Sequence, residues 1–475
     1  MTTGYKWHRI EDFSEDPKSL TDGELEALKR VWANQRAELI ESGALEEFDK
    51  RLRREWAIET GMIEDVYRLD RGVTRTLIEK GIDAALIPHG ASNRDSTLVA
   101  RIIQDQYEAL EGLLDFVGGR RQLSTGYVKE LHAALLRNQE SHTVVDQLGR
   151  AFEKRLELGK YKDAPNSPTR PDGAVHEYSP PEHVASEMER LLEMHARHEA
   201  EGVPVEVEAA WLHHRFSQIH PFADGNGRVA RALASMVFIK SGWFPLVIRS
   251  DDKARYIDAL EKADRGDLRH LISIFVESQR NAVIQATEIA FDVKPVSTED
   301  EAVAAVRDRL LGRGKIALKE WLEAKTTAND LVQFSVHRLE KTARLLNEEI
   351  GRVGTGFNFG AGGGAQGGYD DVRARMVQKA GQVADFTDYN AMAQLAMNAG
   401  RYDSLTISFQ AIGPRFRGII GVVAYLSIHD AEPILIPGGT FQINYAEDVA
   451  KAQTRFSNWL DHVIVEGLNQ WRRTL

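Results

Sequence analysis

Apolar residues recur every three or four positions through most of the first 290 residues, and this spacing constrains the fold more than any other feature of the chain. Leu25, Leu28, Val31 and Trp32 show it in the first such stretch, with glutamate, lysine and arginine between them. A segment with this period buries one face as a helix. The stretches predicted to be helical are 20–58, 61–80, 95–117, 123–136, 183–199, 205–219, 228–241 and 256–279. The chain is therefore predicted to be mainly α.

The helical pattern breaks between residues 158 and 182, where five prolines and two glycines fall among asparagine, aspartate and serine. Proline fixes its own backbone angle and cannot donate a backbone hydrogen bond, and the other residues favour turns. A β-hairpin that stands out from the helices as a flap is the structure predicted for 158–182.

Beyond residue 290 the pattern changes from helix to strand. The segments predicted there are a linker at 293–300, helices at 301–312 and 316–350, a glycine-rich loop or hinge at 351–368, and a closing helix at 446–471. Between the last two, Leu405, Ile407 and Phe409 alternate with polar residues, which indicates a strand. The C-terminal part is therefore predicted to be helical and then a small α+β region.

A chain of 475 residues is longer than one hydrophobic core usually organises, so two to three domains are expected. No repeat of fixed period is present, which disfavours solenoids and propellers. The predicted division is an N-terminal helical region at 1–94, a helical core at 95–290, a helical segment at 301–350, the glycine-rich loop at 351–368 and a small α+β region at 369–475.

Composition excludes several classes of protein. The hydrophobic fraction of 43% and charged fraction of 28% are those of a globular protein, and no apolar run is long enough to cross a bilayer. The chain has no cysteine, which rules out disulfides and thiolate chemistry and favours a cytoplasmic protein. Its formal charge of −11 makes nucleic acid an unexpected partner.

The segment HPFADGNGRVAR, residues 220–231, joins two predicted helices and concentrates polar residues in the connection. Gly225 and Gly227 permit left-handed backbone angles and Asn226 tolerates them, so that successive N–H groups can point into one concavity. The helix that begins near Arg228 adds unpaired N–H groups and the positive end of its dipole. Such an arrangement binds phosphate groups.

Three charged residues of this segment point to a nucleotide with a metal ion. Arg228 and Arg231 lie in the first turn of a helix, where cations are disfavoured unless an anion such as a polyphosphate compensates them. Asp224 would repel that polyphosphate unless a hard cation such as Mg²⁺ lies between them. His220 carries the side chain best suited to proton abstraction near neutral pH and is the candidate general base, whereas Phe222 is expected to anchor the loop.

A DGNG sequence alone is more often an ordinary turn, and a single histidine near a helix end is usually only solvated. The order of the residues in 220–231, however, resembles the signature of the Fic (filamentation induced by cAMP) family, His-x-Phe-x-Asp/Glu-Gly-Asn-Gly-Arg-x-x-Arg. The matching residues are His220, Phe222, Asp224, Gly225, Asn226, Gly227, Arg228 and Arg231. The resemblance covers roughly 95–280, with a Fic-type helical core and the flap at 158–182 within it.

The resemblance implies a protein adenylyltransferase that uses ATP and Mg²⁺ to transfer AMP to a Ser, Thr or Tyr hydroxyl of a target protein. His220 would be the base and Asp224 would hold Mg²⁺. The residues from Gly225 to Gly227 would bind the α- and β-phosphates, and Arg228 and Arg231 the β- and γ-phosphates. Tyr256 stands where many Fic proteins contact adenine, although it is equally consistent with an aromatic residue that packs a helix.

Many Fic proteins carry an inhibitory helix of the form Ser/Thr-x-x-x-Glu-Gly/Asn, whose glutamate pairs with the second arginine of the signature. Thr60 and Glu64 match this form, but Asp65 stands where Gly or Asn is expected. The prediction is autoinhibition through Glu64. Glu79 is a weaker candidate because Arg75 replaces the Ser or Thr.

Two alternatives to AMP transfer remain open from the sequence. Relatives of this fold perform other chemistry, including AMP removal and the transfer of other nucleotide or phosphoryl groups. The chain could also be a nucleotide-sensing module without catalysis, although both His220 and Asp224 are retained.

The flap would bind the target protein by pairing with an extended segment. Self-modification and a homo-oligomer are compatible with this interpretation.

Overall fold

The computed structural model describes residues 5–21, 23–41, 44–88, 90–119, 121–145, 151–168, 175–289, 315–350, 356–365, 371–412, 419–444 and 447–475. The chain divides into two compact units. The first unit consists of Met1–Thr21 and Asp49–Gln279, and the second of Asp22–Phe48 and Arg280–Leu475. None of the described helices is both long and apolar enough to span a membrane.

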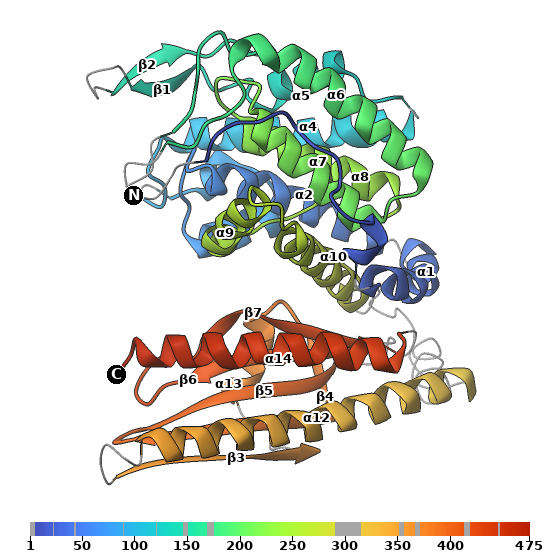
Figure 1. Cartoon of the computed structure of the whole chain (residues 1–475), viewed down its shortest axis with the longest axis vertical. Coiled ribbons are helices and arrows are strands. Elements are labelled where there is room, and N and C mark those ends of the chain that lie inside the picture. Colours follow the sequence, from blue (N-terminus) through green and yellow to red (C-terminus); the bar gives the residue numbers. More distant parts are fainter. Residues whose placement is uncertain are drawn as a thin grey trace. The chain divides into compact units, whose positions relative to one another are not determined.

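The first unit is a helical bundle around a buried central pair of helices (Figure 1). Its helices are α2 (Ala44–Ile63), α3 (Arg71–Lys80), α4 (Ser96–Gly118), α5 (Thr125–Leu135), α6 (Pro181–Glu201), α7 (Val205–Ile219), α8 (Asn226–Lys240), α9 (Lys253–Ala263) and α10 (Arg269–Ile289), with short 3₁₀ turns η1 (Pro17–Ser19), η2 (Ala84–Leu86) and η3 (Ser250–Asp252). Helix α10 continues past Gln279 into the second unit. The central pair is α7 and α8, which are buried along almost their whole length.

Two of the surrounding helices, α4 and α5, start at residues whose side chains cap the helix. The carboxylate of Asp95 accepts a hydrogen bond from the backbone N–H of Leu98 at the start of α4, and the hydroxyl of Ser124 accepts one from Tyr127 at the start of α5. Both are N-caps that satisfy backbone donors with no partner inside the helix. The mainly α character of the N-terminal part is therefore confirmed.

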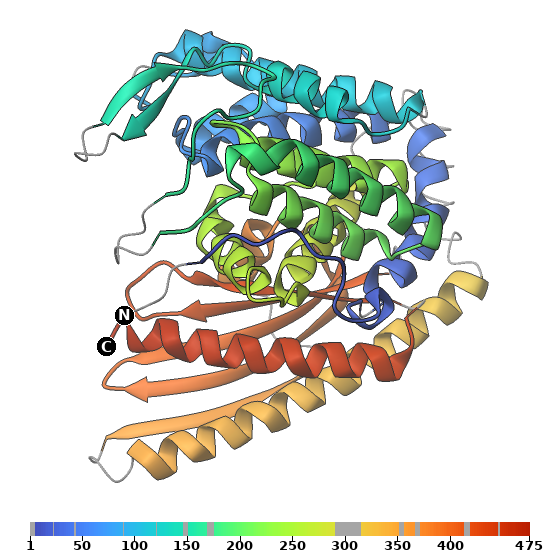
Figure 2. The same ribbon diagram turned by 45° about the horizontal axis from the view of Figure 1, so that its top comes forward.

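The two-stranded hairpin lies upstream of the segment predicted to form it. Strands β1 (Ser141–Val145) and β2 (Ala151–Arg155) pair in antiparallel fashion and stand away from the helices (Figure 2). The described parts of the flap, 158–168 and 175–182, contain no strand, and a hydrogen bond from His176 N to Pro168 O joins its two arms. The prolines explain this irregular structure, since each removes a donor that a strand ladder needs.

The second unit is a five-stranded antiparallel sheet with helices on both faces. Its elements are α1 (Glu24–Glu41), α12 (Lys315–Ile350), β3 (Phe357–Ala365), α13 (Asp371–Lys379), β4 (Ala384–Ala399), β5 (Tyr402–Ile412), β6 (Ile419–Ser427), β7 (Ile434–Asn444) and α14 (Val449–Arg472). The strand order is that of the sequence, β3-β4-β5-β6-β7. Helices α12 and α14 cover one face and share its apolar core, while α13 packs on the other (Figures 1 and 2).

Several predictions for the C-terminal part are corrected by this arrangement. Residues 357–365, predicted as part of a loop or hinge, form β3, and a Cβ atom on Gly363 would lie 2.1 Å from the carbonyl oxygen of Met392 on β4. The close approach of two backbones requires glycine there, and pairing with β4 outweighs the local turn preference. Helix α12 shares one core with the strands instead of forming a separate segment. The predicted linker at 293–300 and helix at 301–312 lie outside the described residues.

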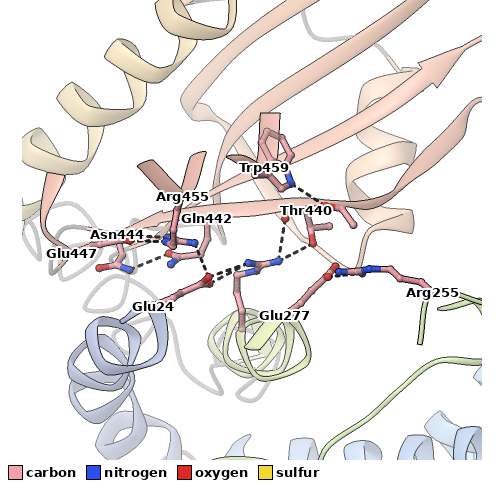
Figure 3. A network of polar contacts seen from close by, with 11 residues as sticks. Glu24, Arg255, Glu277, Thr440, Gln442, Asn444, Glu447, Arg455 and Trp459 are labelled. Carbon is pink, nitrogen blue, oxygen red and sulfur yellow. Dashed lines mark hydrogen bonds and ion pairs between the residues drawn. The ribbon is translucent and has the colours of Figure 1, made fainter. Parts of the chain in front are cut away.

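The helix predicted at 20–58 is two helices that belong to different units. Helix α1 belongs to the second unit, where Glu24 is 2% exposed and its carboxylate bridges two arginines. Its oxygens lie 3.1 Å from Nη1 of Arg280 and 2.6 Å from Nη1 of Arg455, and Arg455 also binds Glu447 (Figure 3). This network of charges joins α1, α10 and α14 within the second unit.

We expect Glu24→Gln to lower the stability of the protein by about 3–5 kcal/mol, because two buried guanidinium groups would lose a shared anion. Urea unfolding measures the effect, and Glu26→Gln is the matched control because Glu26 is exposed on the same helix. Equal stability of the two variants would contradict a structural role for the network.

Candidate active site

The loop between α7 and α8 has a backbone conformation that its sequence makes accessible. His220 caps the end of α7 with a φ angle of 53°, and Gly225 precedes α8 with a φ angle of 79°. The N–H of His220 donates to the carbonyl of Phe216 at 2.9 Å, which closes the last turn of α7. Left-handed angles are open to glycine and tolerated by histidine more readily than by branched residues. The chain therefore reverses sharply and brings both helix ends to one place.

Asn226 and Phe222 hold this loop closed from inside. The Asn226 amide accepts a hydrogen bond from Phe222 N at 2.9 Å and donates one to Phe222 O at 2.8 Å. Phe222 is fully buried, as predicted for an anchor, and its ring stacks on His132 at 3.8 Å between centroids. The side chain of Asn226 is thus engaged within the loop. Its backbone N–H is left for the predicted concavity of N–H groups from Gly225 to Gly227, called the nest below.

His132 of α5 connects the loop to the flap. Its Nδ1 lies 2.9 Å from Gly159 N, a donor, so Nδ1 accepts. Its Nε2 lies 3.1 Å from the carbonyl oxygen of Asp224 and must donate. Burial lowers the pKa of His132 to about 4, which agrees with a neutral ring that makes both bonds. His132 therefore positions Asp224, although no motif in the sequence singles it out.

Arg228 and Asp224 are joined by Gln139, which lies between α5 and β1. The Gln139 amide donates to Oδ2 of Asp224 at 2.5 Å and accepts from Nη2 of Arg228 at 2.7 Å. Burial opposes the ionisation of Asp224, but Arg228, the Gly225 N–H and Gln139 together lower its pKa. Arg228 is fully buried, and its Nε and Nη1 have no hydrogen-bond partner among the described residues. The buried Nε and Nη1 atoms of Arg228 can thus donate to an anion, next to the ionised carboxylate of Asp224.

Arg231 is held by the end of α2. Its Nε donates to the hydroxyl of Thr60 at 2.8 Å, its Nη2 to the Thr60 carbonyl at 2.9 Å and its Nη1 to Oε1 of Glu64 at 2.7 Å. Burial disfavours the charge of Arg231, but Glu64 and Tyr256 together outweigh it, so that the pKa of Arg231 is raised. A Cβ atom on Gly227 would lie only 2.2 Å from Oε1 of Glu64. The Glu64 carboxylate therefore lies directly over the glycine nest.

The backbone around Asp65 explains its departure from the inhibitory motif. Val66 N donates to Gly61 O and Asp65 N to Met62 O, which are the two bonds of a Schellman motif at the end of α2. Asp65 has a φ angle of 52°, the left-handed conformation that this motif requires. Glycine and asparagine adopt it most easily, but aspartate also tolerates it. Asp65 therefore satisfies the backbone requirement and leaves Glu64 in place over the nest.

His220 is a neutral imidazole with one nitrogen free. Its Nδ1 lies 3.2 Å from the carbonyl oxygen of Ser217, so Nδ1 carries the proton and Nε2 keeps its lone pair. Tyr178 of the flap stacks on the ring, with centroids 3.7 Å apart and an interplanar angle of 3°. Burial first, and then the nearby Lys162, lower the pKa of His220 to about 3. The geometry suits a proton acceptor.

Two candidates remain, Tyr256 and Glu79. Tyr256 is 3% exposed, its hydroxyl is 2.6 Å from Nε2 of His213, and it interacts with Arg231. That position agrees with the packing alternative, and the contact of Tyr256 with adenine stays a prediction. Glu79 is exposed on α3, and the carboxylate that meets Arg231 is that of Glu64. The residues near the site without a sequence signal are Gln139, His132, Lys162 and Tyr178.

These features describe a helical domain in which a glycine-rich helix start and a buried arginine lie close to a neutral histidine. Residues 122–238 match the model of the Fic/DOC family. The chain is 30% identical over 180 residues to a protein adenylyltransferase Fic of Nematostella vectensis, covering 36% of this chain and 40% of that protein. It is 44% identical over 79 residues to a Fido domain-containing protein of Dictyostelium discoideum, covering 15% and 54% respectively.

Two solved structures are also similar. A Fic domain-containing signaling protein of Bacteroides thetaiotaomicron has 22% identity and a TM-score of 0.45, covering 57% of this chain and 100% of that chain. Fic-1 of C. elegans has 21% identity and a TM-score of 0.39, covering 55% and 72% respectively. The match over residues 122–238 confirms the resemblance to the Fic/DOC family that the loop sequence indicates. The chain spans less than two thirds of the length of these curated relatives.

Proposed function

We propose that this protein is an adenylyltransferase that transfers AMP from ATP to a Ser, Thr or Tyr hydroxyl of a target protein and is held in check by Glu64. The observation that carries the proposal is the state of Arg228, a fully buried cation with two N–H groups that lack partners among the described residues. Burying donors without hydrogen-bond partners costs free energy, unless a ligand supplies the acceptors. They lie beside a glycine nest at a helix start, where phosphate oxygens bind best.

In this proposal each residue of the loop has one role. The N–H groups from Gly225 to Gly227 bind the α- and β-phosphates, and Arg228 and Arg231 bind the β- and γ-phosphates. Asp224, which stays ionised, holds Mg²⁺, and no group of three or more His, Asp or Glu side chains among the described residues is arranged to bind a metal by itself. The donor set fits Mg²⁺, which commonly takes one or two carboxylates together with phosphate oxygens and water.

The chemical step is an in-line displacement at the α-phosphorus. Nε2 of His220 accepts the proton of the target hydroxyl, the hydroxyl oxygen forms a bond to the α-phosphorus, and the bond to the oxygen that bridges to the β-phosphate breaks. Pyrophosphate leaves with the negative charge, which the arginines stabilise. The target would lie along the flap at 158–182, and the same site would accept a hydroxyl of this chain in self-modification.

Glu64 would inhibit this reaction by occupying Arg231. An ATP γ-phosphate needs the same Nη1 atom that Glu64 binds at 2.7 Å. The pair is charge-assisted and its arginine is buried, so that nucleotide must compete with it. Tyr256 would support Arg231, with which it interacts, and its contact with adenine stays a prediction.

The proposal is tested by supplying ATP labelled at the α-phosphate or at the γ-phosphate to the purified protein with Mg²⁺. Label from the α-phosphate alone should become attached to protein, with release of pyrophosphate. Attachment of the γ-label would instead indicate phosphoryl transfer, and nucleotide binding without any attached label would indicate a sensing module.

Removal of AMP is the second candidate, favoured by the position of Glu64. Its carboxylate lies over the nest and could orient a water molecule toward a phosphorus atom bound there. Incubation of a pre-adenylylated target with the wild-type protein distinguishes the two activities, because release of AMP without added nucleotide is expected only for removal.

Gln139 provides a further test of the metal site. We expect Gln139→Leu to weaken binding of Mn²⁺, as a probe for Mg²⁺, in the presence of ATP by about 10- to 100-fold, the usual effect of removing an outer partner of a metal ligand. Asp224 would lose a 2.5 Å hydrogen bond that orients it. Calorimetry measures the affinity, and Gln104→Leu on exposed α4 surface is the control. Unchanged affinity would remove Gln139 from the site.

A further inference from the structure

Lys162 is a buried cation next to His220 that none of the roles above uses. It is 6% exposed, and its Nζ donates to Oδ1 of Asn166 at 2.7 Å and lies 3.5 Å from the carbonyl oxygen of Ile219. None of the described carboxylates forms an ion pair with it, and burial alone accounts for its pKa, lowered to about 7. A buried ammonium held only by neutral oxygens costs stability, which suggests a functional reason for it.

Lys162 also belongs to a set of bonds that fasten the flap to the catalytic loop. Its backbone N–H donates to Pro221 O at 2.9 Å, and Asn166 Nδ2 donates to Phe222 O at 2.8 Å. The Lys162 ammonium lies 5.8 Å from the centre of the Tyr178 ring, which in turn stacks on His220. The position of the charge relative to His220 is therefore set by the flap and by the end of α7 together.

We propose that Lys162 is a positioning residue of the transfer site, one that fastens the flap to the end of α7 and keeps the imidazole of His220 unprotonated while a polyphosphate is bound. This inference rests on the proposed function. A bound polyanion attracts protons to every base around it. Between two neighbouring bases, the amine is intrinsically the stronger, so the attracted proton goes to Lys162 and its charge then disfavours a proton on His220.

The other charged or titratable groups around His220 do not replace Lys162. Asp224 of the loop favours protonation of His220, and His176 of the flap acts weakly in the opposite sense. Lys162 contributes the largest effect after burial itself. After the reaction, the same positive charge would help His220 to give up the proton that it accepted from the hydroxyl.

The test is a histidine NMR titration of the full chain carrying Glu64→Gly, with Mg²⁺ and an ATP analogue that has a methylene group between the α- and β-phosphates. His220→Asn identifies the His220 signal. With Lys162 present, we expect His220 to stay neutral from about pH 8 to pH 5. With Lys162→Met, His220 should become protonated within this range, and Lys162→Arg should restore the neutral form. A His220 signal that stays neutral in Lys162→Met would overturn the proposal.

Two controls separate this effect from misfolding and from failure of the proposed function. Lys160 lies two residues from Lys162, is exposed and pairs with Glu157, so Lys160→Met should leave the titration unchanged. Lys162→Met should unfold at a temperature no lower than the parent, because a costly buried charge is removed. The titration needs no transfer, so it stays informative even if no AMP is transferred. Where transfer occurs, Lys162→Met should move the acid limb of the pH profile of kcat to higher pH. A kcat lowered equally at all pH values would indicate a purely structural loss and would refute the role.

Discussion

Glu64→Gly is expected to raise the rate of AMP transfer by roughly 5- to 150-fold, the range that corresponds to a coupling of 1–3 kcal/mol between two competing ligands. The Glu64 carboxylate accepts a hydrogen bond from Nη1 of Arg231, the atom that would bind the γ-phosphate of ATP in the proposed function. Removal of the carboxylate leaves that donor to the nucleotide. The rate is measured as label transferred from the α-phosphate of ATP to the protein.

Asp65→Asn is the matched control for this variant. Asn keeps the left-handed backbone at the end of α2, and Asp65 itself binds Lys253 and Arg68 rather than Arg231. Its rate should stay close to that of the wild type. A Glu64→Gly variant no faster than Asp65→Asn would argue against inhibition by Glu64.

Thermal unfolding also tests whether Glu64 and the nucleotide compete for Arg231. Without nucleotide, Glu64→Gly should be less stable by about 1–3 kcal/mol, because Arg231 keeps its bonds to Thr60 but loses its anion. Mg²⁺ and ATP should then raise the melting temperature of this variant more than that of the wild type, since tighter binding to the folded state stabilises it more. An equal increase in both proteins would mean that Glu64 and nucleotide do not compete.

His220→Asn in the Glu64→Gly background is expected to lower the rate of transfer by about 10²–10⁴-fold, the usual contribution of a general base. Asparagine is preferable to alanine here because residue 220 has a φ angle of 53°, which asparagine tolerates. The loop and the nest should therefore stay intact, and ATP affinity, measured by calorimetry, should be nearly unchanged.

The control for this variant is His270→Asn, which changes an exposed histidine on α10. It should transfer AMP at the parent rate. Weak ATP binding by His220→Asn would show that His220 supports the nest rather than accepts a proton. A parent-like rate would remove it from the chemistry altogether.

The sequence predicts the local part of this site well. The reversal of the chain at 220–231 depends on residues that accept left-handed angles, and the helix that follows depends on its own first turn. At the end of α2, the resemblance to the inhibitory helix implies that Glu64 pairs with Arg231, and the two side chains are in contact. The bond from Arg231 to the Thr60 hydroxyl is a finding of the structure. The roles of these residues in catalysis and inhibition remain predictions for the experiments above.

Patterns of local composition were less reliable where pairing between distant segments decides the structure. The glycine-rich stretch resembles a loop by composition, yet 357–365 becomes a strand because β4 supplies its hydrogen-bond partners. The helical pattern of 20–58 gives no sign that α1 and α2 belong to different units, since both have an apolar face and only packing decides what covers it.

What the sequence determines by itself about this protein is thus its mainly helical character, its resemblance to the Fic/DOC family and the loop at 220–231, because each depends on residues a few positions apart. What only the tertiary structure decides is which groups surround that loop. Gln139 reaches Asp224 across 85 positions, and no motif singles it out. Lys162 lies next to His220 because the flap folds back onto the end of α7. Such contacts depend on burial and on the charge of partners brought together by folding, which no local motif records.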